Sequence, residues 1–371
     1  MAEEGAATAG LEPASSERAQ RFEAAARKLL TRAVEESVTP GAVLQVTGRA
    51  GDGASIAVGA RSYGGAAVDL DTRYDLASLT KVVACLPSLL TLLESGEVSL
   101  DDTVGRFFSN AGWFQEEPNL SQVTIEELTT HSSGLPAWTP LFAWVSERRT
   151  ATANVLQTSL SGKRGAYDYS DLGVMVLGAI IERVTGERLD AVARRVAYLP
   201  LGMTDTTFGP LAEGSNVAAT EDDGWRGRLL QGEVHDENAW AMQGVAAHAG
   251  LFGTAADVTR YARTWLLDEA PFASPEWLAE ARRDRSNGSG PPRGILWRLN
   301  SSTWRLGDTL SRAAYGHTGF TGTSLVIEPE QGWTCVLLTN RVHPRRGGTD
   351  GIVKLRRDVH ALAVDVFSSD D

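Results

Sequence analysis

Hydrophobic positions recur with helical spacing near both ends of the chain. Apolar residues return every three or four positions between Phe22 and Val34, and again between Leu355 and Val366, so each stretch predicts an amphipathic helix. Short runs rich in β-branched residues lie between these two stretches in the sequence and predict strands. The predicted strands cover residues 42–46, 55–58, 294–299, 323–327 and 333–338. The first two are joined by a hairpin signal, Gly51-Asp52-Gly53.

The middle of the chain predicts helices instead of strands. Residues 78–95 are apolar on nearly every side, which is typical of a buried central helix, and Gly96 follows where such a helix would end. Mostly helical segments separated by Gly- and Pro-rich loops continue to about residue 285.

This order of elements predicts an α/β (α+β) fold with two domains. Residues 15–77 and 290–371 are expected to form an antiparallel sheet built from both termini and flanked by the terminal helices. Residues 78–289 are expected to form a large, mainly helical domain inserted between them, with the active site in the cleft between the two domains. Residues 1–14 are expected to be a flexible tail.

Composition narrows the classes of function. The 371 residues include 35 basic and 47 acidic side chains, and the net charge of −12 disfavours phosphate backbones and anionic lipid. No apolar run has the length of a membrane span, and the N-terminus lacks the features of a secretory signal. The two cysteines, Cys85 and Cys335, have neither metal-binding nor disulfide-framework spacing. We therefore expect a cytoplasmic protein that binds no nucleic acid, membrane, metal or other cofactor.

Ser78 lies three residues before Lys81 at the start of the predicted buried helix. Residues at this spacing share a helix face, so the ammonium can reach the hydroxyl. A serine hydroxyl needs such a neighbouring base or positive charge to act as a nucleophile. Two residues alone also occur together by chance, but a charge in an apolar helix is costly to bury, which favours a functional pair.

Tyr169, Ser170 and Asp171 precede a second apolar run, residues 172–181. A tyrosine near two cationic groups can relay a proton and serve as general base for a serine. Alternatively, Ser170 or Asp171 caps a helix and Tyr169 only packs before it. Taken alone, the segment favours the cap.

A glycine-rich segment, Tyr315–Gly322, contains His317-Thr318-Gly319 and leads into a predicted strand. Its glycines allow the backbone to approach a ligand closely, and the N–H groups of an edge strand can bind an oxyanion. In isolation, the segment favours a hairpin with a surface histidine.

His235, Asp236 and Glu237 are adjacent residues that could suggest metal ligands. Consecutive positions cannot all face one ion, and no second cluster completes a ligand set. His248 is too distant along the chain for us to expect it beside them. The sequence therefore predicts no metal site here.

The three motifs Ser78-x-x-Lys81, Tyr169-Ser170-Asp171 and His317-Thr318-Gly319 occur in an order that resembles the serine β-lactamase and penicillin-binding-protein superfamily. The likeness is to its class C-like branch, which includes family VIII carboxylesterases and D-aminopeptidases. The resemblance implies a β-lactamase-like fold and an acyl-enzyme on Ser78. Lys81 would assist deprotonation and Tyr169 would relay the proton, with the choice of general base left open.

The resemblance also implies the substrate contacts. The backbone N–H groups of Ser78 and Phe320 would form the oxyanion hole. Asp171 and the His317-Thr318-Gly319 segment would contact the substrate.

Two departures from the family pattern bear on the substrate. His317 replaces a lysine whose fixed charge would hold a β-lactam carboxylate, and histidine is mostly neutral near pH 7. Asp171 replaces the asparagine of class C β-lactamases, and a carboxylate cannot donate to a substrate amide. We therefore expect a carboxylesterase that hydrolyses small carboxylic esters.

Three alternatives remain. One is an amidase or peptidase on D-amino-acid or muropeptide substrates, because the segments 235–238 and 244–252 resemble a subgroup linked to muropeptide amide cleavage. A second is a weak β-lactamase. The third is a penicillin-recognising binding module, which would have no need of an activated nucleophile.

Overall fold

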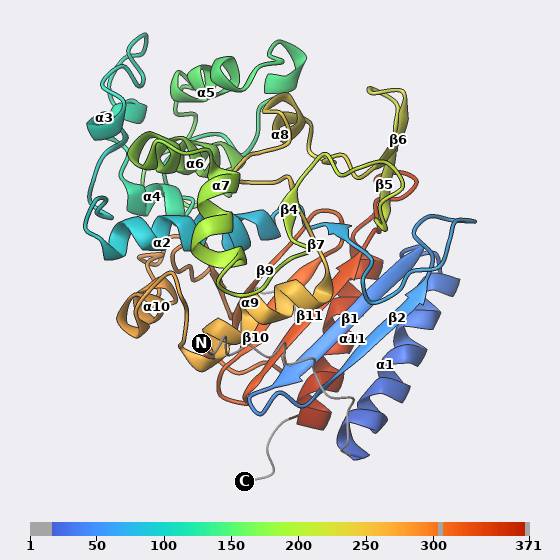
Figure 1. The fold of residues 1–371 in the computed structure, drawn as a ribbon. Helices are drawn as coiled ribbons and strands as arrows, with labels where there is room; N and C mark the ends of the chain where they lie inside the picture. Colours follow the sequence, from blue (N-terminus) through green and yellow to red (C-terminus); the bar gives the residue numbers. More distant parts are fainter. Residues whose placement is uncertain (1–16, 303–306, 368–371) are drawn as a thin grey trace, which may run out of the picture.

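The computed structural model describes residues 17–302 and 307–367, and its main element is a six-stranded antiparallel sheet in the order β2-β1-β11-β10-β9-β8 (Figure 1). The strands are β1 (Gly41–Gly48), β2 (Gly53–Gly59), β8 (Arg298–Leu299), β9 (Tyr315–Thr318), β10 (Ser324–Glu328) and β11 (Trp333–Thr339). β1 pairs with β11, with Ala42 opposite Thr339. The prediction that both ends of the chain contribute strands to one sheet is confirmed. The predicted tail, residues 1–14, lies outside the described residues.

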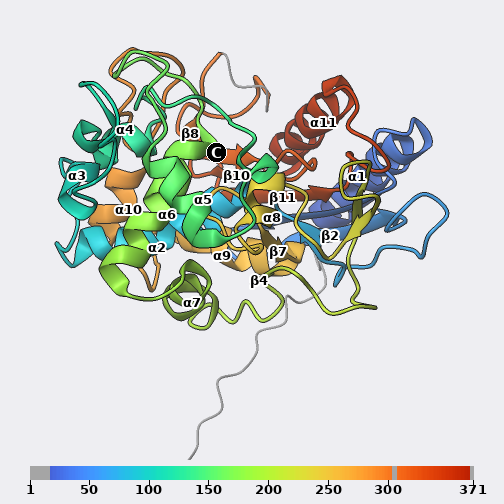
Figure 2. The ribbon, with the colours of Figure 1, turned by 90° about the horizontal axis from the view of Figure 1, so that it is seen from above.

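Helices cover both faces of this sheet (Figures 1 and 2). α1 (Glu17–Glu35) and α11 (Asp350–Phe367) lie side by side on one face, and α9 (Ala255–Leu267) lies on the other. Successive residues of β1 face opposite layers: Leu44 packs in the cluster formed with α1 and α11, whereas Val43 belongs to the larger core on the side of α9. This alternation is the period-two pattern that predicted the strand.

The remaining helices form a region that adjoins the sheet on the α9 side (Figure 1). They are α2 (Leu86–Glu94), α3 (Val104–Phe107), α4 (Ile125–Thr129), α5 (Arg148–Leu156), α6 (Asp171–Thr185), α7 (Leu189–Ala193), α8 (Glu237–Ala241) and α10 (Pro275–Ala281), with π-helical turns at Lys81–Cys85 and Arg194–Tyr198 and short 3-10 turns at Leu120–Gln122 and Leu141–Ala143. The first π-helical turn leads directly into α2, and Gly96 follows that helix with a φ of +72°. The predicted buried central helix is thus present. Among the described helices, none is both long and apolar enough to span a bilayer.

Short strands outside the main sheet were not predicted. β3 (Tyr74–Asp75), β7 (Leu251–Gly253) and β4 (Thr207–Phe208) form a three-stranded sheet, and β5 (Ala219–Asp223) pairs with β6 (Arg228–Gln231). Strands this short contain too few positions for an alternating pattern to be recognised.

The strand predicted over residues 294–299 is wrong for its first four residues, because only the last two form β8. Leu296 has a φ of +60°, which is incompatible with an extended strand. The Ile295 N–H instead donates to the carbonyl oxygen of Ala281, at 2.8 Å, so the chain turns toward the end of α10 before it joins the sheet.

The close approach of β9 to β10 generates a prediction about stability. A Cβ atom at Gly316 would lie 2.1 Å from the carbonyl oxygen of Leu325, so Gly316→Ala would force the strands apart. We expect its free energy of unfolding to fall by about 1–3 kcal/mol, measured by urea denaturation. The matched control is Gly224→Ala, because a Cβ at this turn position would meet no heavy atom within 4 Å. Equal unfolding midpoints for the two variants would contradict the prediction.

Candidate active site

Ser78 follows a strained turn between β3 and the central helix. Ala77 has a φ of +47°, which L-residues rarely adopt, and its N–H donates to Asp75 Oδ1 at 2.8 Å. The other carboxylate oxygen of Asp75 accepts the His235 N–H at 2.7 Å. Burial raises the pKa of this carboxyl despite the two hydrogen bonds. A buried carboxyl group therefore holds the turn that presents Ser78.

Lys81 is fully buried, and its ammonium makes two hydrogen bonds and one ion pair. Nζ lies 2.8 Å from Ser78 Oγ, 3.1 Å from the carbonyl oxygen of His248 and 2.7 Å from Asp171 Oδ1. Burial alone would lower the pKa of Lys81, but Asp171 and Tyr169 together outweigh burial and raise that pKa above its usual value. Lys81 is therefore charged at neutral pH, and it contacts Ser78 as the sequence spacing suggested.

Tyr169 lies directly before α6, beside both Ser78 and Lys81. Its ring centroid is 5.2 Å from Lys81 Nζ and 5.5 Å from the guanidinium carbon of Arg293. The next residue, Ser170, caps α6 by accepting the Gly173 N–H at 3.1 Å. The helix cap and a place for Tyr169 beside the nucleophile therefore coexist, although the sequence suggested them as alternatives.

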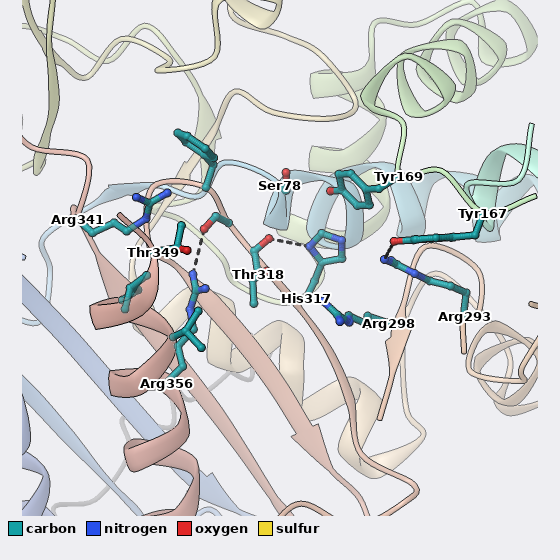
Figure 3. Close-up of a pocket in the computed structure, with 14 residues that line it drawn as sticks. Ser78, Tyr167, Tyr169, Arg293, Arg298, His317, Thr318, Arg341, Thr349 and Arg356 are labelled. Atoms are coloured by element: carbon teal, nitrogen blue, oxygen red, sulfur yellow. Dashed lines mark hydrogen bonds between the residues drawn. The ribbon is translucent and has the colours of Figure 1, made fainter. Parts of the chain in front are cut away.

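β9 brings His317 to the cavity wall across from Tyr169, with 6.2 Å between the ring centroids (Figure 3). Its Nδ1 lies 3.0 Å from the carbonyl oxygen of Thr318. Burial, together with the charges of Lys81 and Arg293, lowers the pKa of His317 well below its usual value. The imidazole is therefore neutral at the site.

The loop after β9 is fastened to the segment before Ser78. The hydroxyls of Thr321 and Thr323 donate to the carbonyl oxygens of Asp75 and Leu76, at 2.8 and 3.0 Å. Neither the Ser78 N–H nor the N–H of Phe320, on this loop, donates a hydrogen bond to another described residue. Two N–H groups next to the nucleophile are thus available to an oxyanion.

A cavity of about 360 Å³ beside Ser78 is lined by four arginines that sequence reasoning missed: Arg293, Arg298, Arg341 and Arg356 (Figure 3). Arg293 is only 2% exposed, and its Nη2 donates to the Tyr167 hydroxyl at 2.5 Å. Its Nε and Nη1 have no hydrogen-bond partner among the described residues. These arginines belong to no motif, and their convergence depends on how distant segments pack.

A second cavity, of about 250 Å³, adjoins Ser78 and is lined by Trp138, Asp171, Asp236 and His248 among others. His248 Nε2 lies 2.8 Å from Asp236 Oδ1, a contact that nothing in the sequence indicated. The carbonyl oxygen of the same residue, His248, accepts a hydrogen bond from Lys81 Nζ. His235 pairs separately with Glu221, at 2.7 Å.

Comparisons with known proteins agree with this arrangement. A family model described as Beta-lactamase matches residues 26–357. A protein of Escherichia coli K12 named "Putative D-alanyl-D-alanine carboxypeptidase" is 34% identical over 306 residues, which are 73% of this chain and 70% of the relative. An N-acetylmuramyl-L-alanine amidase of Bacillus subtilis 168 is 32% identical over 306 residues, 73% of this chain and 68% of the relative.

Solved structures share the fold at lower identity. EstCE1, a hydrolase with promiscuous acyltransferase activity, has a TM-score of 0.73 at 21% identity, covering 93% of this chain and 99% of its own. The octameric penicillin-binding protein homologue from Pyrococcus abyssi has a TM-score of 0.71 at 21% identity, covering 92% and 76%. The fold expected from the three motifs is confirmed.

The buried histidines of the site generate a prediction about pH. Burial and the charges of Arg293 and Lys81 lower the pKa of His131 as well as that of His317. In the unfolded chain each histidine titrates near pH 6.5. Below that pH the unfolded state binds more protons than the folded state, so stability falls as the pH decreases.

We expect a loss of up to about 1.4 kcal/mol per pH unit for each histidine between pH 6.5 and 5. Urea unfolding across this range measures the slope. His131→Asn should flatten it, because asparagine keeps an acceptor for the Ser170 N–H but does not titrate. An unchanged slope in this variant would contradict the assignment.

Proposed function

This chain belongs to the Beta-lactamase family and is a serine hydrolase, and from that premise we propose that it cleaves amide bonds in small, acidic peptide fragments of the bacterial cell wall. The cleavage would proceed through an acyl-enzyme on Ser78. Two relatives at 32–34% identity bear names of cell-wall amide hydrolases, which supports this substrate class over simple esters.

The observation that carries the proposal is the buried guanidinium of Arg293. It has no ion-pair partner among the described residues, and a buried charge without a counter-ion is costly. The cavity that it lines also contains Ser78, so an acidic group of the substrate can supply the missing negative charge. Arg293 would thus provide the fixed positive charge that the neutral His317 does not.

The proposed acylation uses the contacts around Ser78. Ser78 Oγ attacks the amide carbonyl carbon. The resulting oxyanion accepts hydrogen bonds from the backbone N–H groups of Ser78 and Phe320. Lys81 keeps its proton, because Asp171 raises its pKa, and stabilises the negative charge that develops on Oγ. The Tyr169 hydroxyl accepts the Ser78 proton and donates its own proton to the leaving nitrogen as the C–N bond breaks, so Tyr169 ends the step protonated as it began. Asp171 acts here as the counter-ion of Lys81, a different role from the substrate contact implied by the family resemblance.

In deacylation, water is the nucleophile and Ser78 Oγ is the leaving group. A water molecule attacks the ester carbonyl carbon, and its proton passes through Tyr169 to Ser78 Oγ as the acyl C–O bond breaks. The same two N–H groups hold the second oxyanion, and the product leaves as a carboxylic acid.

Hydrolysis of small neutral esters, the activity expected from the sequence, is a second candidate. The half-exposed ring of Phe320 and the indole of Trp138 line the second cavity and offer an apolar surface for a short acyl chain. The neutral His317 also imposes no charge requirement at its position.

The nucleophile and its partners are tested first. Ser78→Ala should abolish turnover, and a fluorophosphonate probe should label the wild type at Ser78 alone. Lys81→Ala and Tyr169→Phe should each slow acylation by about 10²-fold or more. The first removes the charge that stabilises Ser78 Oγ, and the second removes the hydroxyl that transfers the Ser78 proton. The double variant should lose much less than the product of the single losses. Stopped-flow acylation rates measure this, and multiplicative losses would show that Lys81 and Tyr169 do not act as one unit on the Ser78 hydroxyl.

The substrate class is tested on one protein with three substrates: an N-acetylmuramyl peptide, p-nitrophenyl butyrate and nitrocefin. We expect the muramyl amide to have the highest kcat/KM relative to its uncatalysed rate. Arg293→Met should lower that kcat/KM by about tenfold or more while affecting p-nitrophenyl butyrate much less, because the peptide carries an acid group and this ester does not. Arg283→Met, on an exposed arginine, is the matched control. Turnover of the ester alone would establish the second candidate instead.

A further inference from the structure

Two arginines lie on the side of the Ser78 cavity away from Arg293 (Figure 3). Arg341 follows the end of β11, and Arg356 is on α11. Their side chains are 9% and 7% exposed, and Thr349 lies between them at the cavity wall (Figure 3). This position differs from that of Arg293, because His317 and Thr318 separate the two sides.

The hydrogen bonds of these arginines leave their charge uncompensated. Arg356 Nη2 donates to the carbonyl oxygens of Gly319 and Thr323, at 3.1 and 2.7 Å, and its Nε has no partner among the described residues. Arg341 Nη1 makes only a long contact of 3.4 Å with the carbonyl oxygen of Gly347. The guanidinium of Arg341 also lies 4.8 Å from the ring centroid of Phe320. All of these partners are neutral.

Within the ranges that the structure describes, no carboxylate pairs with either arginine. Burial lowers the pKa of both, and the nearby charge of Arg341 contributes to lowering that of Arg356, to about 9. Arg346, on the same loop as Arg341, provides a contrast, because it pairs with both Glu221 and Glu237. Arg341 and Arg356 are therefore two neighbouring buried cations without an acid, and an anionic ligand would compensate their charge.

We propose that Arg341 and Arg356 bind a second carboxylate of the substrate, so that the preferred substrate is an acidic peptide carrying at least two carboxylates. This inference rests on the proposed function and specifies its substrate class. One carboxylate would lie at Arg293 and the other at Arg341 and Arg356, on opposite sides of His317. Thr349 offers a hydroxyl to the second carboxylate. A peptide with acid groups at both positions would thus be held at two points, with Ser78 between them.

The experiment measures binding, so it does not depend on which bond is cleaved. Ser78→Ala protein is titrated by calorimetry with two peptides, N-acetyl-L-alanyl-D-glutamate and its isoglutamine analogue, which differ by one carboxylate. We expect the dicarboxylate to bind about tenfold more tightly or better. Arg341→Gln in the same background should reduce that preference to about twofold, and Arg341→Lys should retain most of it.

The matched control is Arg345→Gln, which neutralises an exposed arginine on the same loop that does not line this cavity and should keep the full preference. Because Arg356 also holds backbone carbonyls, only Arg341 is substituted. An absent preference, an unchanged preference in Arg341→Gln, or no binding of either peptide would overturn the inference. Muramyl amide turnover without a carboxylate preference would leave the proposed function intact, and a preference without amide turnover would refute only the proposed function.

Discussion

A fully buried ammonium is the constraint on which the rest of the site depends. Lys81 can remain charged away from water only because Ser78, Asp171 and the His248 carbonyl all reach it. These groups come from the central helix, the start of α6 and the loop before β7. Removing one partner of such a buried pair typically costs about 3–5 kcal/mol. The charge of Lys81 is therefore compensated by three segments that meet at the nucleophile, and His248, on one of them, also contacts Asp236.

The sheet contributes to the site through a second, tightly fitted contact. Thr321 and Thr323 reach the carbonyl oxygens of residues 75 and 76, across about 246 positions of sequence. A Cβ atom at Gly319 would lie 2.7 Å from the carbonyl oxygen of Leu76, so glycine is the residue that permits this approach. The nucleophile turn and the loop that carries Phe320 are thus held as one unit. Two oxyanion donors on separate segments require such a rigid connection.

The distribution of charge around Ser78 changes the inference drawn from His317. A neutral histidine in place of a lysine suggested an uncharged substrate. Arginines from three other segments, at residues 293, 341 and 356, line the same cavity as that histidine. The pKa of His317 is low because of burial and the nearby charges of Lys81 and Arg293. A single motif residue therefore shows only whether a charge is present at its own position. The electrostatic field at the nucleophile is the sum of the charges on all the elements that line the cavity.

The sequence by itself determined those features that depend on near neighbours in the chain. Periodicity identified the terminal helices and the main strands, and the three-residue spacing of Ser78 and Lys81 placed both on one helix face. The three motifs were sufficient to identify the fold, because each combines residues whose order along the chain is diagnostic. Irregular backbone escaped this reasoning: the segment before β8 depends on a contact of Ile295 with Ala281, which no local pattern contains.

Only the tertiary structure decided which distant charges meet. Lys81 and Asp171 are 90 positions apart, and Arg293 and Arg341 flank the nucleophile without any motif of their own. A single arginine in a sequence has the same appearance whether it pairs with an acid, as Arg346 does, or remains buried without one, as Arg341 does. That difference arises from the packing of the loop after β11 against α11 and Phe320, and packing between elements far apart in the chain leaves no periodic signal.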